Sequence, residues 1–260
     1  MTLTLDVGNS QIYGGLFNGE VLVLQFRKNS LNSFSSDEIG IFLKNVLREN
    51  GFNTAEISDI SICSVVPDKI HSITSGCVKY FNIDPFFLQP GVKTGLKIKY
   101  KNPHEVGADR IANAVAATKF FPRKNIIIVD FGTATTFCVI SKNNEYLGGV
   151  IIPGIRISME SLESHTAKLP RVEIKIPDSS YGKSTVESIQ IGLYTGQIGM
   201  VKEITKSITE EVFQEEKPLI IGTGGFSSLF QNAGIFDKID STLVLHGLYE
   251  TLKLNKGNEC

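Results

Sequence analysis

Residues 2–10 read TLTLDVGNS, and residues 125–136 read NIIIVDFGTATT. In each stretch an apolar, strand-like run ends at an aspartate, Asp6 or Asp130, and a glycine and hydroxyl side chains follow. Glycine lets a backbone approach a ligand closely, and N–H groups and hydroxyls can donate to phosphate oxygens. A carboxylate beside those oxygens suits a hydrated magnesium ion. One such turn alone most often only ends a strand, but two in repeated contexts predict a cradle for the phosphates of a nucleotide.

The elements predicted after Asp6 set the pattern for the first half of the chain. The Asn18–Gly19 pair lies between two apolar runs and predicts a tight β-hairpin, because both residues tolerate positive φ. Apolar spacing predicts a helix over residues 36–50, with Ser36 or Asp37 as its cap. A strand over 59–66, a helix over 69–81 and a short strand over 85–91 complete the pattern.

The second half repeats this order. After Asp130 a second hairpin is predicted to turn through Asn143–Asn144. The remaining pattern predicts a strand over 217–225 and helices over 154–166, 185–212, 226–230 and 245–254. We therefore predict an α/β fold with two similar domains, residues 1–118 and 119–260, and allow for the C-terminal helix to pack back on the first. A two-fold arrangement would bring both aspartate motifs to the walls of one cleft.

Bulk composition excludes several classes of protein. The 260 residues carry 26 basic and 27 acidic side chains, so no basic surplus points to nucleic acid. No apolar stretch approaches the ~20 residues of a membrane span, and the N-terminus does not resemble a signal peptide. The four cysteines have no C-x-x-C spacing and the four histidines are scattered, which favours reduced, buried thiols over disulfides or zinc. We expect a cytoplasmic protein with neither a nucleic-acid nor a membrane partner.

Two further motifs are less specific. The glycines of GTGG at residues 222–225 lie between an apolar strand and a predicted helix, where they could accept adenosine or phosphate or form a plain turn. GKST at 182–185 follows a strand-like VEIKI at 172–176 and resembles the end of a P-loop. Pro177 stands where that motif requires glycine. Thr185 is therefore expected to cap the long helix or to contact a substrate.

Asp109 and Arg110 begin another predicted helix, within HEVGADRIANAVAA at residues 104–117. In a cleft, Asp109 could take a proton from a hydroxyl nucleophile, and Arg110 could hold an anionic group of the substrate. The alternative is an aspartate favoured by the helix dipole, beside a surface arginine.

Taken together, the motifs identify a family. The sequence strongly resembles the type III pantothenate kinases, which belong to the acetate-and-sugar-kinase/Hsp70/actin superfamily and include proteins of the Bvg accessory factor type. The resemblance covers almost the whole chain, through DVGNS, CSVVPD, PGVKTGLKIKYKNPHEVGADRIANAVAA, IIVDFGTATT, YLGGVIIPGIRISMESL, KLPRVEI, GKSTVESIQIGLYTGQIG and GTGG. It implies two ribonuclease H-like domains with mixed sheets flanked by helices, in an actin-like ATPase architecture.

The resemblance also implies an activity, the ATP-dependent phosphorylation of pantothenate on its 4′-hydroxyl, the first step towards coenzyme A. Asp109 would be the catalytic base. The ATP-binding residues would be Asp6, Val7, Gly8, Asn9, Ser10, Gln11, Ile12, Tyr13 and Thr133. Pantothenate would contact Tyr100, Gly107, Ala108, Asp109, Arg110 and Thr185. Asp130 would bind a monovalent cation, K⁺ or NH₄⁺, Asp6 would organise Mg²⁺ through water, and the enzyme would be a homodimer. The family usually has threonine in place of Ser10, and the hydroxyl is retained.

Three alternatives remain open at this stage. A non-catalytic nucleotide-binding regulator of the same fold would not need the aspartates Asp6, Asp109 and Asp130. An Hsp70-like nucleotide-hydrolysing switch would need a peptide-binding domain, for which 260 residues leave no room. A kinase of another small hydroxy acid differs only in its substrate.

Overall fold

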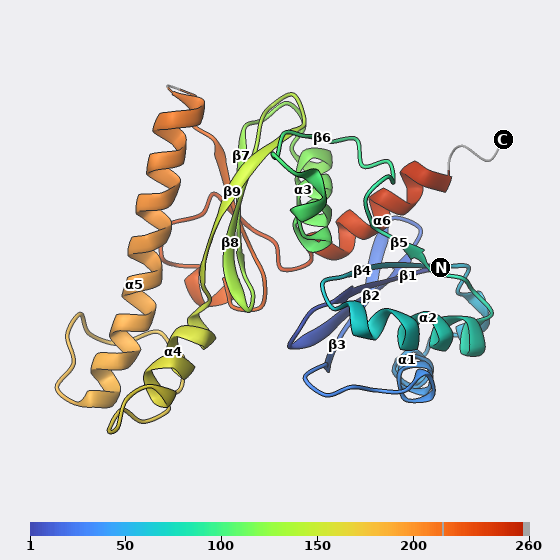
Figure 1. The fold of residues 1–260 in the computed structure, drawn as a ribbon, viewed down its shortest axis with the longest axis horizontal. Coiled ribbons are helices and arrows are strands. Elements are labelled where there is room, and N and C mark those ends of the chain that lie inside the picture. The colour runs from blue at the N-terminus through green and yellow to red at the C-terminus, as the bar shows by residue number, and fades with distance from the viewer. Residues whose placement is uncertain (215, 257–260) are drawn as a thin grey trace. The chain divides into compact units, whose positions relative to one another are not determined.

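The computed structural model describes residues 1–214 and 216–256 (Figure 1). Contacts within the chain divide it into two compact units, which we describe separately. The first unit consists of residues 1–96, 101–119 and 243–260, and the second of residues 97–100 and 120–242. Each unit contains one mixed β-sheet, so the predicted α/β class with two repeated sheets is confirmed.

The sheet of the first unit has the strand order β3-β2-β1-β4-β5. Neighbouring strands are antiparallel from β3 to β1 and parallel from β1 to β5. The strands are β1 (Thr2–Val7), β2 (Gln11–Asn18), β3 (Val21–Asn29), β4 (Asp59–Ser64) and β5 (Phe86–Phe87).

Period-2 alternation along β1 gives the two faces of this sheet different partners. Leu3, Leu5 and Val7 lie in a hydrophobic core with side chains from α1 (Ser36–Glu49) and α2 (Pro67–Phe81). Residues on the opposite face of β1 and β4 are covered by α6 (Leu243–Lys256), which was predicted as a helix over 245–254. The buried Ser61 hydroxyl on that face donates to the Leu248 carbonyl of α6 at 3.0 Å.

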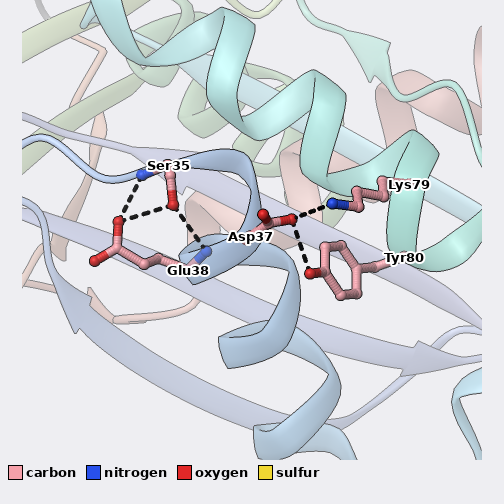
Figure 2. Close-up of polar contacts among 5 residues, drawn as sticks. All are labelled: Ser35, Asp37, Glu38, Lys79 and Tyr80. Atoms are coloured by element: carbon pink, nitrogen blue, oxygen red, sulfur yellow. Dashed lines mark hydrogen bonds and ion pairs between the residues drawn. The ribbon is translucent and has the colours of Figure 1, made fainter.

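The start of α1 differs by one residue from the prediction, because Ser35 rather than Ser36 or Asp37 is the cap. Figure 2 shows that Ser35 and Glu38 form a reciprocal capping box. The Asp37 carboxylate instead accepts from Lys79 at 2.6 Å and from the Tyr80 hydroxyl at 2.8 Å, which connects α1 to the end of α2 (Figure 2). Asp37 is therefore a packing contact between two helices and not a cap.

The sheet of the second unit has the order β11-β10-β7-β8-β9-β6. Its first five strands repeat the first sheet, with β7 in the place of β1 and β10 in the place of β4, in the same parallel and antiparallel senses. The strands are β6 (Lys97–Ile98), β7 (Ile126–Phe131), β8 (Ala134–Ile140), β9 (Glu145–Pro153), β10 (Leu219–Thr223) and β11 (Lys238–Ile239).

The helices of the second unit are α4 (Ile155–Ser164) and α5 (Thr185–Ile208), and a π-helical turn (Thr209–Phe213) extends α5. Buried residues of β7 and β8 form a core with α4 and α5, which includes Phe131, Phe137 and Leu193. Ser184, not Thr185, caps α5, since the Ser184 hydroxyl accepts from the Glu187 N–H at 3.2 Å.

Two other predictions for this unit are wrong. Residues 172–176 form no strand, although Val172 is buried, so the P-loop interpretation of GKST loses the strand it requires. The helix predicted over 226–230 is only a 3₁₀ turn (Ser227–Phe230), too short to offer a phosphate the terminus of a helix.

Both predicted hairpins exist. The second turns at Asn143–Asn144 as predicted, and Asn144 has positive φ (59°). In the first, only Gly19 does (58°), while Asn18 is the last residue of β2. The loop thus consists of Gly19 and Glu20, one position later than the Asn-Gly pair indicated.

The remaining helix, α3 (Ala108–Phe120), belongs almost entirely to the first unit. Short 3₁₀ turns lie at Thr54–Glu56 and Pro103–Glu105. Ala112, Ala114, Ala116 and Ala117 are fully buried within the single chain. A Cβ at Gly247 of α6 would overlap the Ala112 carbonyl, so glycine permits the close crossing of these two helices. These alanines thus pack inside the single chain.

Cys63, Cys77 and Cys138 are buried thiols that form no disulfide with one another, as predicted, and Cys260 lies outside the described residues. In the part of the chain that the structure describes, we find no helix with the length and hydropathy of a membrane span.

Candidate active site

Asp6 lies at the carboxyl end of β1, where the chain turns into β2. The turn is closed by a hydrogen bond from the Gly8 N–H to the Gln11 carbonyl at 3.0 Å. Asp6 and Ser10 are partly exposed and Asn9 is exposed. The first predicted phosphate turn is therefore open to a ligand on the side of its carboxylate and hydroxyl.

Of the remaining predicted loop residues, Gln11 is exposed, whereas the side chains of Val7, Ile12 and Tyr13 lie in the interior. Val7 and Ile12 belong to the hydrophobic core and can serve a ligand only through their backbone. Tyr13 is 6% exposed and donates through its hydroxyl to Gln25 Oε1 at 2.6 Å, while the Arg27 guanidinium lies 3.8 Å above the ring. These contacts tie Tyr13 to β3.

A buried thiol that the sequence did not reveal as part of the site lies beside Asp6. The parallel register of β1 and β4 pairs Asp6 with Cys63, and the Cys63 Sγ lies 3.3 Å from Asp6 Oδ1. Burial raises the pKa of the Cys63 thiol strongly, and the Asp6 and Asp109 carboxylates raise it further. Cys63 therefore stays protonated and can act as a donor to Asp6. An alignment of the apolar runs of β1 and β4 as parallel strands would have indicated that Cys63 lies beside Asp6.

Asp109 is the second residue of α3 and belongs to the same unit as Asp6. Its Oδ1 accepts from the Arg110 N–H at 2.9 Å. Desolvation raises the pKa of the Asp109 carboxyl, and the hydrogen bond and charge of Arg110 oppose this only in part. A Cβ at Gly107 would overlap this carboxylate, so glycine makes room for it.

Arg110 is buried, which excludes the surface arginine of the alternative interpretation. Its Nη2 donates to the Glu105 carbonyl at 3.3 Å. A buried guanidinium at the start of a helix, beside an aspartate that is harder to ionise, suits the recognition of an anionic group. Because Asp6 and Asp109 both act on the Cys63 thiol, the two carboxylates share one electrostatic neighbourhood.

The second turn lies in the other unit, where Asp130 is next to last in β7 and pairs with Thr136 of β8 and Thr223 of β10. The Gly132 N–H donates to the Ala134 carbonyl at 3.1 Å, and Thr133 is exposed at the tip. The GTGG segment is close by, since a Cβ at Gly224 would overlap Asp130 Oδ1. Gly224 also has a φ of 89°, so both its conformation and its surroundings require glycine.

Thr185 is exposed as the first residue of α5, and it lines an open cleft of about 1040 Å³. Ser158, Ser161 and Lys183 supply further polar groups to this cleft, among apolar side chains of α4 and α5. Tyr100 follows β6 and lies near Tyr146, with ring centroids 6.4 Å apart. Tyr100 is not one of the residues that line the cleft.

Solved structures that are similar to this chain show which fold it has. A solved Campylobacter jejuni structure, described as belonging to a Baf family of transcriptional activators, matches with a TM-score of 0.62 at 22% identity over 98% of this chain and 99% of that one. A Sinorhizobium meliloti structure described as a 2-dehydro-3-deoxygalactonokinase matches with a TM-score of 0.60 at 11% identity, over 97% and 96%. At these identities the structures show the fold, which is that of the actin-like ATPases and sugar kinases.

The family follows from sequence. The family model for type III pantothenate kinase matches residues 2–207. A type III pantothenate kinase of Legionella pneumophila (strain Corby) is 56% identical over 255 residues, which cover 98% of this chain and 99% of the relative. The chain therefore belongs to the type III pantothenate kinase family, as its motifs indicated, and is a phosphotransferase of a family that uses ATP.

Proposed function

We propose that this protein transfers the γ-phosphoryl group of ATP to the 4′-hydroxyl of pantothenate, the entry step of coenzyme A synthesis. Family membership supports the reaction. The structural observation that carries it is Asp109, a partly exposed carboxylate at the start of α3 whose pKa is raised by desolvation. A carboxylate of this kind is a stronger base than an ordinary aspartate, and it can accept the proton of an attacking hydroxyl.

Asp109 orients the 4′-hydroxyl and takes its proton as the oxygen–phosphorus bond forms. The bond from the γ-phosphorus to the bridging oxygen breaks, and ADP leaves. Arg110, the buried last residue of the site segment 107–110, holds the pantothenate carboxylate. Most of the catalysis comes from alignment and electrostatic stabilisation.

Residues 6–13 would hold the β- and γ-phosphates through backbone N–H groups and the Ser10 hydroxyl, and Thr133 would contact ATP from the second turn. Gly107, Ala108, Tyr100 and Thr185 would complete the pantothenate site. The exposed position of Thr133 and the cleft beside Thr185 support these roles.

The proposal includes two cations, Mg²⁺ and a monovalent ion, and the residues of the site have the oxygen ligands that such ions prefer. Among the described residues no three His, Cys, Asp or Glu side chains converge, so any ion would share its ligands with substrate, water or backbone. Asp6 would hold Mg²⁺ through water, and Asp130 would hold K⁺ or NH₄⁺, because hard cations prefer carboxylate, carbonyl and water oxygens. When bound, these ions offset the negative charge that develops on the phosphoryl group.

We also propose a cytoplasmic homodimer whose protomers have two domains, residues 1–118 and 119–260. The family resemblance supports the dimer, which sedimentation tests directly. A single species at twice the chain mass of 28.5 kDa is expected. A fully active species at 28.5 kDa would reject the dimer.

The activity is tested by mass spectrometry of products after incubation with ATP, Mg²⁺, K⁺ and a panel of small hydroxy acids that includes pantothenate. We expect one new phosphorylated product, only with pantothenate, and none with the Asp109→Asn variant. A different phosphorylated acid would identify another kinase. No product, with ATP bound and intact, would favour a non-catalytic regulator.

A further inference from the structure

Ser30, just beyond the end of β3, contacts three consecutive residues of the first phosphate turn. The residue is fully buried, and its hydroxyl lies 2.7 Å from the Gly8 carbonyl and 3.2 Å from the Asn9 carbonyl. Its backbone N–H donates to the Ser10 carbonyl at 3.0 Å. Because a hydroxyl has one hydrogen, the carbonyls of Gly8 and Asn9 share it.

The geometry of the peptide bond determines where the backbone N–H groups of the turn point when its carbonyls face Ser30. In a planar trans peptide the C=O and N–H groups point in opposite directions. The Gly8 carbonyl faces Ser30, so the Asn9 N–H points away from it. The Ser10 carbonyl also faces Ser30, so the Gln11 N–H points away as well. Backbone N–H groups directed outward from a turn form an anion-binding concavity.

Ser30 is in turn held in place by a contact with α2. Lys69, in the first turn of α2, donates to the Ser30 carbonyl, and its ammonium group lies 5.8 Å from the centroid of the Phe34 ring. Lys69 is partly buried, which keeps this hydrogen bond away from bulk water. The chain of contacts therefore runs from α2 through Ser30 to the carbonyls of the turn.

We propose that Ser30 is a positioning residue for phosphoryl transfer: it clamps the carbonyl side of the turn at 8–10, so that the N–H groups of Asn9 and Gln11 face the phosphates of ATP. The inference rests on the proposed ATP site at residues 6–13. Neither the motif nor the family resemblance singled out Ser30, because it lies 20 residues beyond the turn in FRKNS, a segment without a recognisable pattern.

The test compares Ser30→Ala with Ser61→Ala in the full chain. Both serines are fully buried, and both donate to a backbone carbonyl of the first unit, but Ser61 donates to α6. Loss of a hydrogen bond corresponds to roughly 2- to 13-fold in an equilibrium constant. We expect Ser30→Ala to raise the Kd for ATP, measured by calorimetry without pantothenate, and the KM for ATP by about this factor. The KM for pantothenate and competition by adenosine, which has no phosphates, are expected to stay unchanged.

Ser61→Ala is expected to lower the melting temperature without this selective loss. Ser30→Thr, which keeps the hydroxyl, is expected to recover most of the ATP affinity. If Ser30→Ala does not fold, Lys69→Met tests the clamp in its place, and Lys79→Met in the same helix is the control. Of these two lysine variants, only Lys69→Met is expected to weaken ATP binding. An unchanged Kd for ATP in Ser30→Ala, or in Lys69→Met where that variant stands in, would overturn the clamp.

Failure of the clamp can be told apart from failure of the ATP site by adding Asp6→Asn. If Asp6→Asn weakens MgATP binding and Ser30→Ala does not, the site stands and the clamp is wrong. If neither variant changes MgATP binding, the assignment of residues 6–13 is wrong, and the clamp is overturned with it. Equal weakening of ATP and adenosine by Ser30→Ala would make Ser30 a merely structural residue and would also overturn the proposal.

Discussion

The two aspartate turns have nearly the same sequence pattern, yet different contacts hold them in place. The first turn is fixed by donors that reach it from other elements: Ser30 on its carbonyl side and Cys63 beside Asp6. The second is fixed by close backbone approach, since side chains at Gly224 or Gly154 would overlap Asp130 or the Thr133 carbonyl. The first turn is therefore vulnerable to the loss of a polar atom, and the second to the addition of a methyl group.

The largest effect is expected outside both turns, at Asp109. Asp109→Asn should lower kcat by ~10²–10⁴-fold, because a general base is lost, while both turns still bind ATP. Steady-state kinetics and calorimetry measure the two quantities. A variant with kcat near that of the wild type would remove Asp109 from the reaction.

Asp109 also gives a prediction for pH. Its pKa is raised in the folded protein, so the ionised carboxylate costs stability at neutral pH, and this cost disappears as the pH falls through the folded pKa. Asp109→Asn should therefore melt at a higher temperature than the wild type at pH 7, and the difference should shrink towards acid pH. Melting curves over a pH series would show this, and a variant less stable at pH 7 would contradict it.

Gly224→Ala tests the second turn by adding one methyl group. Left-handed backbone costs an L-residue about 1–2 kcal/mol, and the new Cβ would also displace the Asp130 carboxylate. We expect a lower melting temperature and weaker ATP binding. Gly225→Ala is the matched control, because a Cβ there would meet nothing within 4 Å. Equal behaviour of the two variants would show that close approach does not hold this turn.

Asp130 itself tests whether the second turn holds a cation. Neither turn contains a lysine, so we expect higher rates in K⁺ or NH₄⁺ than in Na⁺ at fixed ionic strength. Asp130→Ala should reduce this difference together with the use of ATP. Equal rates of the wild type in all three salts would reject the cation site.

The smallest effect is expected at Cys63. A thiol is a weak donor, so Cys63→Ala should change the KM for MgATP by only about two- to fivefold. Cys77→Ala, which removes another buried thiol of the same unit, serves as the control for lost packing. A loss of ATP affinity in Cys77→Ala as large as that in Cys63→Ala would mean that the contact with Asp6 has no specific role.

Local patterns were enough to predict much of this molecule. The apolar runs before Asp6 and Asp130 indicated the two repeated sheets, and the predicted family is confirmed. Caps and turns were misplaced by one residue at Ser35 and Gly19, because several neighbouring residues had suitable side chains and only the folded backbone selects among them. Residues 172–176 have the alternation of a strand but belong to neither sheet.

The residues that hold the first turn in place, Ser30 and Cys63, could not be predicted from the sequence for a different reason. Ser30 and Cys63 act through contacts across 20 to 57 residues of chain, which follow from strand register and not from a motif. The domain boundary near residue 118 and the roles assigned to individual site residues stay predictions.

The most direct test of the central claim is ³¹P NMR of a reaction with ATP, Mg²⁺, K⁺ and pantothenate. Transfer to the 4′-hydroxyl predicts that the ATP signals give way to those of ADP and to one phosphomonoester signal, split by the two protons of the neighbouring CH₂ group. The Asp109→Asn variant should leave the ATP signals unchanged over the same period. Inorganic phosphate in place of the phosphomonoester would show hydrolysis and contradict the proposed transfer, and unconsumed ATP with the wild-type protein would contradict catalysis.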